Sequence, residues 1–152
     1  MKKQFGILGV CLLFMTFWFS GCDEIGTKPD HITVNIMAAV FVKLIDANDN
    51  VLNISVDGAP VNIEMTKEGI DRLTFERVMQ SGLCQATGSF DLSKDQYLEC
   101  TATVPKGYQG YSAVAPGYAK LTWETVNAST NFGGMYNWYP KFVIHLKNGL
   151  VI

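Results

Sequence analysis

The chain has 152 residues, of which 48% are hydrophobic and 17% charged, and its formal net charge is −2. This length accommodates one domain and hardly two. The mildly acidic balance argues against nucleic acid as a partner, because proteins that bind nucleic acid carry basic patches. It also argues against a polybasic grip on anionic lipid.

The first 21 residues have the parts of an export signal. Lys2 and Lys3 precede an apolar run over residues 5–19, FGILGVCLLFMTFWF, and small residues follow it. A membrane-spanning helix needs about 20 apolar residues, so this shorter run predicts a signal peptide over residues 1–21 that is removed. Its removal takes away two lysines and no acid, which changes the net charge from −2 to −4.

Ser20-Gly21-Cys22 resembles the end of the lipobox of exported lipoproteins, although Phe19 stands where that family most often has leucine. In that family the cysteine is diacylated and becomes the first residue of the mature protein. The resemblance implies a lipid anchor on Cys22, with two acyl chains because one chain holds only marginally. The other interpretation is an ordinary signal cleaved nearby, with Cys22 a free thiol.

Residues 22–31 then contain the lipidated cysteine and a short polar tether with Gly26 and Pro29. Asp23, directly after the cysteine, resembles a signal for staying on the inner membrane of two-membrane bacteria. We therefore expect the protein on the outer face of the cytoplasmic membrane, which is the periplasmic side if the cell has two membranes.

Period-two alternation of apolar and polar residues dominates the rest of the chain and is typical of half-buried strands. The first such segment, residues 32–45, is apolar on both faces, so it is either a central strand or one that serves two sheets. The later segments are VNIEM at 61–65, RLTFE at 72–76, GSFDL at 88–92, QYLECTATV at 96–104, AKLTWET at 119–125 and KFVIHLK at 141–147.

Turn-forming residues separate these segments, and none has a helical period over eleven residues. We therefore predict an all-β domain over residues 32–152, an antiparallel β-sandwich of seven or eight strands. A small barrel is the alternative, because it closes the same strands differently.

Gly58, Pro60 and Val61 begin one strand; Gly82, Phe90 and Leu92 form a second element; Tyr97 and Gly107-Tyr108 form a third. This pattern resembles the prealbumin-like, carboxypeptidase-regulatory-type branch of immunoglobulin-like domains. Lys94-Asp95-Gln96 departs from the Pro-Gly that the family often has before its tyrosine strand. The resemblance covers residues 32–126 and implies an immunoglobulin-like sandwich that serves as a structural or binding module, with no catalytic residues.

Cys84 and Cys100 remain once Cys11 leaves with the signal and Cys22 takes lipid. An even pair in an exported chain favours a disulfide. The Cα atoms of a disulfide lie within about 7 Å, however, and a simple hairpin centred near Ser93–Lys94 puts the two cysteines out of register. A disulfide and two buried free thiols are both open.

The polar residues indicate no catalytic chemistry. His31 lies in the tether and His145 on the polar face of the last strand, and both fit a solvated surface. No cysteine or histidine pair has zinc-site spacing, and no nucleophile elbow is present. We therefore predict that the protein is not an enzyme and has neither a metal nor a cofactor.

Two further patterns have ordinary structural explanations. Asp46, Asn48 and Asn50 resemble the first half of a calcium loop, but Val51 and Asp57 stand where glycine and glutamate are required; a tight turn explains them equally well. Asn53 and Asn127 begin glycosylation triplets, which chance also produces.

Aromatic residues gather late in the chain, and rings with a polar group suit surfaces that are half apolar and half wet. We predict a binding platform on the loops at 105–117 and 127–140, with the alternative that the rings plug the end of the sandwich. The platform residues are Tyr108, Tyr111, Phe132, Tyr136, Trp138 and Tyr139.

Together these features predict a non-catalytic lipoprotein whose single domain binds an envelope protein or a glycan. The alternative is a structural subunit of a surface assembly, in which the first or last strand pairs with a neighbour's sheet edge. The oligomeric state is open.

Overall fold

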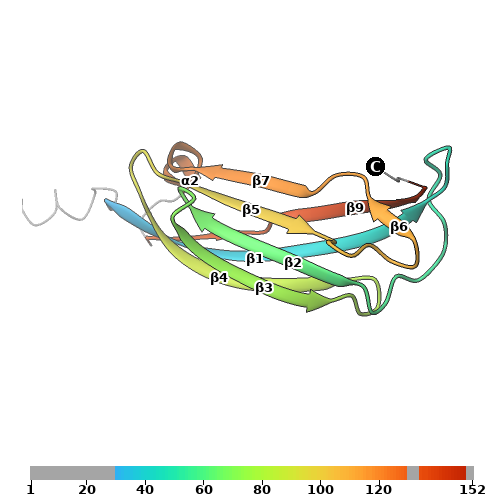
Figure 1. Ribbon diagram of the computed structural model, residues 1–152. Coiled ribbons are helices and arrows are strands. Elements are labelled where there is room, and N and C mark those ends of the chain that lie inside the picture. The colour runs from blue at the N-terminus through green and yellow to red at the C-terminus, as the bar shows by residue number, and fades with distance from the viewer. Residues whose placement is uncertain (1–29, 130–133, 150–152) are drawn as a thin grey trace, which may run out of the picture.

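The computed structural model describes residues 30–129 and 134–149. Within these residues, nine strands and one short helix form two β-sheets that pack face to face as an elongated sandwich (Figure 1). The predicted all-β sandwich is thereby confirmed.

The first sheet, sheet A, is built around β1 (His31–Ile45). β1 pairs antiparallel with β4 (Cys84–Ser93) and parallel with β8 (Met135–Trp138) and β9 (Lys141–Asn148). β6 (Tyr111–Ala113) pairs antiparallel with the end of β9. Sheet A is therefore mixed, whereas the sequence analysis predicted antiparallel pairing throughout.

The second sheet, sheet B, is antiparallel throughout and has the order β3-β2-β5-β7. Its strands are β2 (Pro60–Lys67), β3 (Asp71–Val78), β5 (Tyr97–Thr103) and β7 (Gly117–Thr122). β4 and β5 follow one another in the chain but belong to different sheets, so the Ser93–Lys94 region crosses between sheets instead of forming a hairpin.

β8 and β9 lie along the same side of β1 in one register. Thr33 is opposite Met135 and Ala39 is opposite Lys141, so the offset does not change across Tyr139 and Pro140. In a parallel ladder the even-numbered residues of this segment bond to β1, as the Ala39 N–H to Pro140 C=O bond of 2.9 Å shows. Pro140 has no N–H, so the ladder misses one bond there and one extended segment is divided into two strands.

The core lies between the sheets and consists of the inward-facing residues of the alternating strands. The first strand is central in sheet A, and every second residue from Ile32 to Leu44 is buried. Ile63, Met65, Leu98 and Cys100 face them from sheet B. Burying a large aliphatic side chain stabilises the fold by about 1.5–3 kcal/mol, so this alternation drives the pairing of the two sheets.

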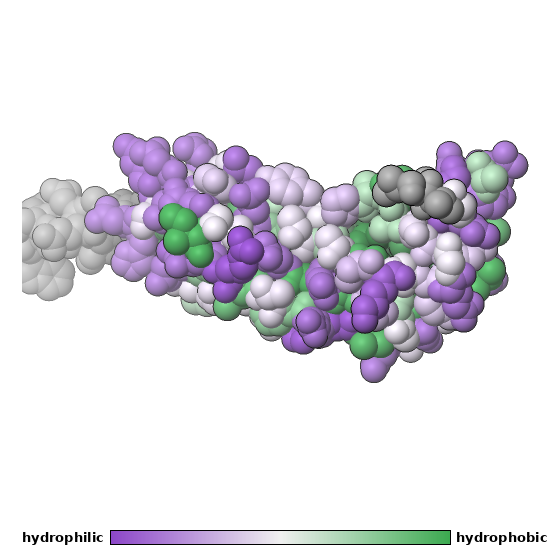
Figure 2. All heavy atoms as spheres, in the orientation of Figure 1, coloured by the Kyte–Doolittle hydropathy of each residue, from purple (hydrophilic) through white to green (hydrophobic). Residues whose placement is uncertain are grey.

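A helix that the sequence analysis did not predict, α2 (Trp123–Ser129), follows β7. The alternation in AKLTWET ends at Thr122, and Trp123 and Val126 are buried one helical turn apart against the core. In Figure 1 the helix lies at the end of the sandwich where β1 begins, and Figure 2 shows hydrophilic residues gathered over that end.

Candidate binding surface

The outer face of sheet A carries side chains in rows that run across β4, β1 and the β8–β9 segment. Successive rows are set by the register of the strands. One row contains Ser89, Asn35 and Asn137, which come from three different strands. The next contains Thr87 and Met37, with Tyr139 beside Met37 in the continued register.

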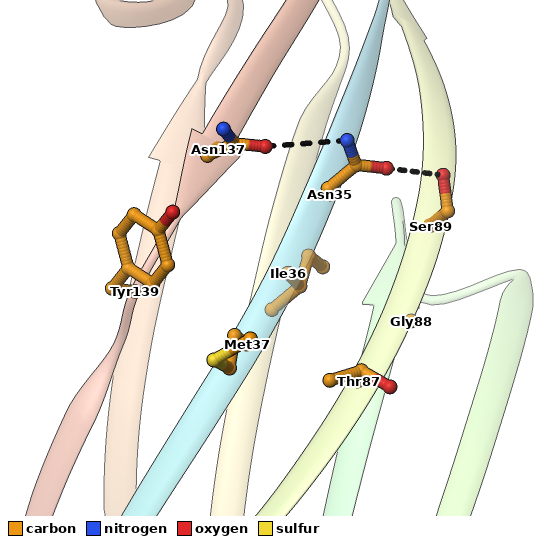
Figure 3. Close-up of a pocket in the computed structure, with 8 residues that line it drawn as sticks. All are labelled: Asn35, Ile36, Met37, Thr87, Gly88, Ser89, Asn137 and Tyr139. Atoms are coloured by element: carbon orange, nitrogen blue, oxygen red, sulfur yellow. Dashed lines mark hydrogen bonds between the residues drawn. The ribbon is translucent and has the colours of Figure 1, made fainter.

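The first of these rows is a continuous hydrogen-bonded ladder (Figure 3). The Ser89 hydroxyl donates to Asn35 Oδ1 at 3.2 Å, and Asn35 Nδ2 donates to Asn137 Oδ1 at 3.2 Å. Asn35 is held from both sides, so the three polar groups have fixed positions on the sheet. Such preorganisation lowers the entropy lost when a ligand binds.

A shallow hollow of about 380 Å³ lies beside this ladder. Tyr139 is 65% exposed and Met37 is 43% exposed, so both present apolar surface to solvent. In Figure 3, Tyr139, Met37 and Thr87 lie along the next row of the sheet, below the three hydrogen-bonded residues. The hollow thus combines one exposed ring with amide and hydroxyl groups.

The apolar character continues farther along the same face. Phe41 of β1 is half-buried beneath Lys141, whose Nζ lies 4.9 Å from the ring centroid, and Val143 is 47% exposed. An exposed apolar surface bordered by polar groups is typical of an interaction site.

The outer face of sheet B is charged. Arg72 and Glu64 form an ion pair of 3.4 Å. The Tyr118 hydroxyl donates to Glu99 at 2.6 Å, and this hydrogen bond raises the pKa of Tyr118. These polar groups partner one another, whereas the hollow on sheet A has no charged residue in its lining.

The structure does not bring the predicted aromatic platform together. Tyr111 pairs with Asn148, whereas Tyr136 pairs with Val34 near the start of β1. Twelve residues of extended segment separate Tyr136 from Asn148, which is about 40 Å at roughly 3.3 Å per residue. Tyr108 therefore lies with Tyr111 at one end of the domain, and Tyr136 and Trp138 lie toward the opposite end.

Four of the platform rings are partly buried and pack against the core. They are Tyr108, Tyr111, Tyr136 and Trp138. Tyr139 is the exception and is mostly exposed. Phe132 lies outside the described residues.

Of the two states left open for Cys84 and Cys100, the structure has the second: both are free, buried thiols. Cys84 is in sheet A and Cys100 is in sheet B, opposite Met65. A Cβ built at Gly88 would lie 2.8 Å from Met65 Sδ, so Met65 faces Gly88, four residues along β4 from Cys84. That offset is about 13 Å, well beyond the span of a disulfide. Burial raises the pKa of both thiols, that of Cys100 to about 12.

The Asp46 loop is a self-contained turn. Asp46 Oδ1 accepts hydrogen bonds from the backbone N–H groups of Asn48 at 2.8 Å and Asn50 at 2.9 Å. These bonds, that of Asn50 foremost, lower the pKa of Asp46. Asp49 pairs with Lys147 at 2.8 Å. The carboxylates are occupied by protein donors, which favours the turn over the calcium interpretation.

The remaining predicted residues do not line the hollow. Asn53 is exposed in the loop between β1 and β2, and Asn127 is half-buried in α2. His31 and His145 are exposed. Cys22 and residues 1–21 lie outside the described residues. Over residues 30–129 and 134–149, no three His, Cys, Asp or Glu side chains gather as a metal site would require.

Asn35, Ser89 and Asn137 were not among the residues predicted from the sequence. A signal for Asn35 was present, because it is an amide in a strand that is apolar on both faces. Its partners come from segments 54 and 102 residues away, and the pairing that joins them is not visible in the sequence.

Comparison with protein families, characterised protein sequences and solved structures found no match to this chain. Within the described residues, no helix has the length and apolar character needed to cross a bilayer.

Proposed function

We propose that this protein is an exported, lipid-anchored, non-catalytic domain that binds a component of the cell envelope through the outer face of sheet A. The observation that carries the proposal is the contrast between the two faces. Tyr139, Met37 and Val143 are exposed on sheet A, whereas on sheet B Arg72 pairs with Glu64 and Tyr118 hydrogen-bonds to Glu99.

The anchoring part of the proposal rests on the lipobox-like Ser20-Gly21-Cys22, and the immunoglobulin-like relationship rests on the strand motifs. On this proposal the predicted tether, residues 23–31, keeps the domain close to the membrane. The protein would therefore bind a partner that lies near the membrane surface, through the outer face of sheet A.

The test of the binding face is site-specific photo-crosslinking in intact cells from position 37 on sheet A and from position 118 on sheet B. Tyr118 is 55% exposed, which makes it a matched control. We expect one reproducible partner from position 37, lost in the Tyr139→Ala variant, and none from position 118. A partner captured only from position 118 would contradict the proposed face.

The test of the anchor is membrane fractionation with mass spectrometry of the mature amino terminus. We expect acyl chains on Cys22 and release of the Cys22→Ser variant from the membrane fraction. An unmodified Cys22 in the membrane fraction would remove this part of the proposal.

A second candidate function, a subunit joined to its neighbours by strand pairing, is favoured by the outer edge of the β8–β9 segment. The odd-numbered residues of this segment direct their backbone groups away from β1. Among the described residues, pairing on that side is limited to β6 at positions 146–148 and the Val114 N–H to His145 C=O bond of 2.9 Å. Such an edge can accept an added strand.

Sedimentation velocity over a range of protein concentrations tests this candidate. Val143→Pro removes an edge-directed N–H, and Val143→Thr keeps it. If strand pairing assembles the protein, the proline variant remains monomeric while the threonine variant assembles like the parent. A parent chain that is monomeric at all concentrations sinks this candidate.

A further inference from the structure

We propose that the hollow beside the Ser89–Asn35–Asn137 ladder binds an uncharged sugar unit of an envelope glycan. The inference rests on the proposed function, since it names the ligand class of the same face. Three features of the hollow carry it: the hydrogen-bonding capacity of the ladder, the exposed ring of Tyr139, and the lack of charged lining groups.

The ladder matches the hydrogen-bonding character of sugar hydroxyls, each of which is both a donor and an acceptor. Ser89 donates to Asn35, and Asn35 donates to Asn137, so all the internal bonds run in one direction. This leaves the two N–H hydrogens of Asn137 Nδ2 without a partner among the described residues, together with lone pairs on the Asn35 and Asn137 oxygens. Neighbouring hydroxyls of one sugar ring can bond to such adjacent amide groups.

Tyr139 supplies the apolar contact that such a ligand needs. A pyranose ring has faces made of C–H groups, and these pack on aromatic rings, which combine an apolar body with a polar tip. Tyr139 is 65% exposed and follows Asn137 by two residues, so the ring and the amide lie on the same face of the sheet. Met37 continues the apolar surface on the neighbouring strand.

The lack of charged groups in the lining of the hollow favours an uncharged ligand. Its lining contains no Asp, Glu, Lys, Arg or His. The nearest acid in the rows, Asp91, accepts a hydrogen bond from Thr33 Oγ1 at 2.8 Å, and Lys141 lies over Phe41. A phosphate or carboxylate group would therefore lose its hydration without gaining a charged partner. The volume of about 380 Å³ lies within the range of about 300–1,000 Å³ found for ligand sites.

The test is calorimetric titration of the full chain, purified as the cell produces it, with three probes. Two are uncharged tetrasaccharides, one of β-1,4-linked N-acetylglucosamine and one of α-1,4-linked glucose. The third is a tetramer of galacturonate, which is charged. We expect saturable binding of at least one uncharged probe, at least tenfold weaker binding by Tyr139→Ala and Asn35→Ala, and a change of no more than twofold in Tyr118→Ala.

Amide NMR spectra provide a second readout that a loss of folding would not imitate. The bound probe should shift the side-chain amide signals of Asn35 and Asn137 and leave those of Asn62, on sheet B, unchanged. Failure of both uncharged probes to bind overturns the sugar proposal, as does equal binding of galacturonate or unchanged affinity in Tyr139→Ala. If crosslinking from position 37 still captures a protein that depends on Tyr139, the proposed function survives that failure. If no uncharged probe binds and crosslinking from position 37 captures no such protein, both the sugar proposal and the proposed function are wrong.

Discussion

At the scale of single residues, two glycines set how closely the sheets approach. A Cβ at Gly117 would lie 2.7 Å from Phe142 Cδ1 and 2.9 Å from Phe142 Cβ. A Cβ at Gly88 would lie 2.8 Å from Met65 Sδ and 2.9 Å from Leu73 Cδ1. The contacts differ in kind, because Met65 and Leu73 meet Gly88 with the ends of flexible side chains, while Phe142 meets Gly117 close to its own backbone.

We expect Gly117→Ala to lower the free energy of unfolding by about 1–3 kcal/mol, the range found for overpacked cores. Gly88→Ala should cost less than half as much, because Met65 and Leu73 can rotate away. Urea unfolding of the two variants compares them directly. Equal costs would show that the packing around Phe142 yields as readily as that around Gly88.

Asp46 is the other residue whose role the structure defines. Its pKa is lowered from the ordinary value of 3.8 by the hydrogen bonds of the turn. A carboxylate with a lowered pKa stabilises the fold above its unfolded pKa and loses that effect as the pH falls through the folded one. We expect Asp46→Ala to lower the melting temperature at pH 7 and to match the parent chain in strongly acidic solution.

Calcium chloride provides the matching control for the turn. It should leave the melting temperature of the parent chain unchanged, because the Asp46 oxygens already accept hydrogen bonds from Asn48 and Asn50. A calcium-dependent rise that disappears in Asp46→Ala would restore the calcium interpretation.

At the scale of elements, Pro140 divides one extended segment into β8 and β9. The C=O of Met37 faces position 140 and receives no N–H from it. Pro140→Ala should complete the ladder, and the new N–H at position 140 should be protected from hydrogen exchange. The Tyr139 N–H, which points away from β1, is the internal control. Rapid exchange at position 140 would contradict the continuous register.

At the scale of the whole molecule, the stagger between sheets keeps Cys84 and Cys100 apart. In a chain with Cys11→Ser and Cys22→Ser, neither remaining thiol should react with a thiol-specific reagent at pH 8 until the protein is unfolded, when both should react. Reaction of either thiol in the folded protein, or no reaction of either after unfolding, would contradict two free, buried thiols.

The raised pKa of Cys100 also predicts how the stability of the fold depends on pH. Stability should fall as the pH rises through the ordinary thiol value of 9.0, because only the unfolded state loses the proton there.

The sequence by itself determined that the domain is all-β and which face of most strands is buried. Alternation in VNIEM and KFVIHLK has a local cause, since successive side chains on a strand point to opposite faces. The same local pattern placed Trp123 in a strand. In the structure Trp123 begins α2, because a helix there buries both Trp123 and Val126, one helical turn apart. The pattern also predicted too much burial for β3, an edge strand on which Leu73 remains 36% exposed.

Only the tertiary structure decided which strands are neighbours, and hence the mixed sheet, the separation of the two cysteines and the candidate binding surface. Asn35, Ser89 and Asn137 meet because β4 and β8 flank β1. Alternation says which face a side chain occupies but not which strand lies beside it. Strand pairing depends on the packing of the whole core. A surface that is assembled from three distant segments therefore cannot be predicted from any one of them.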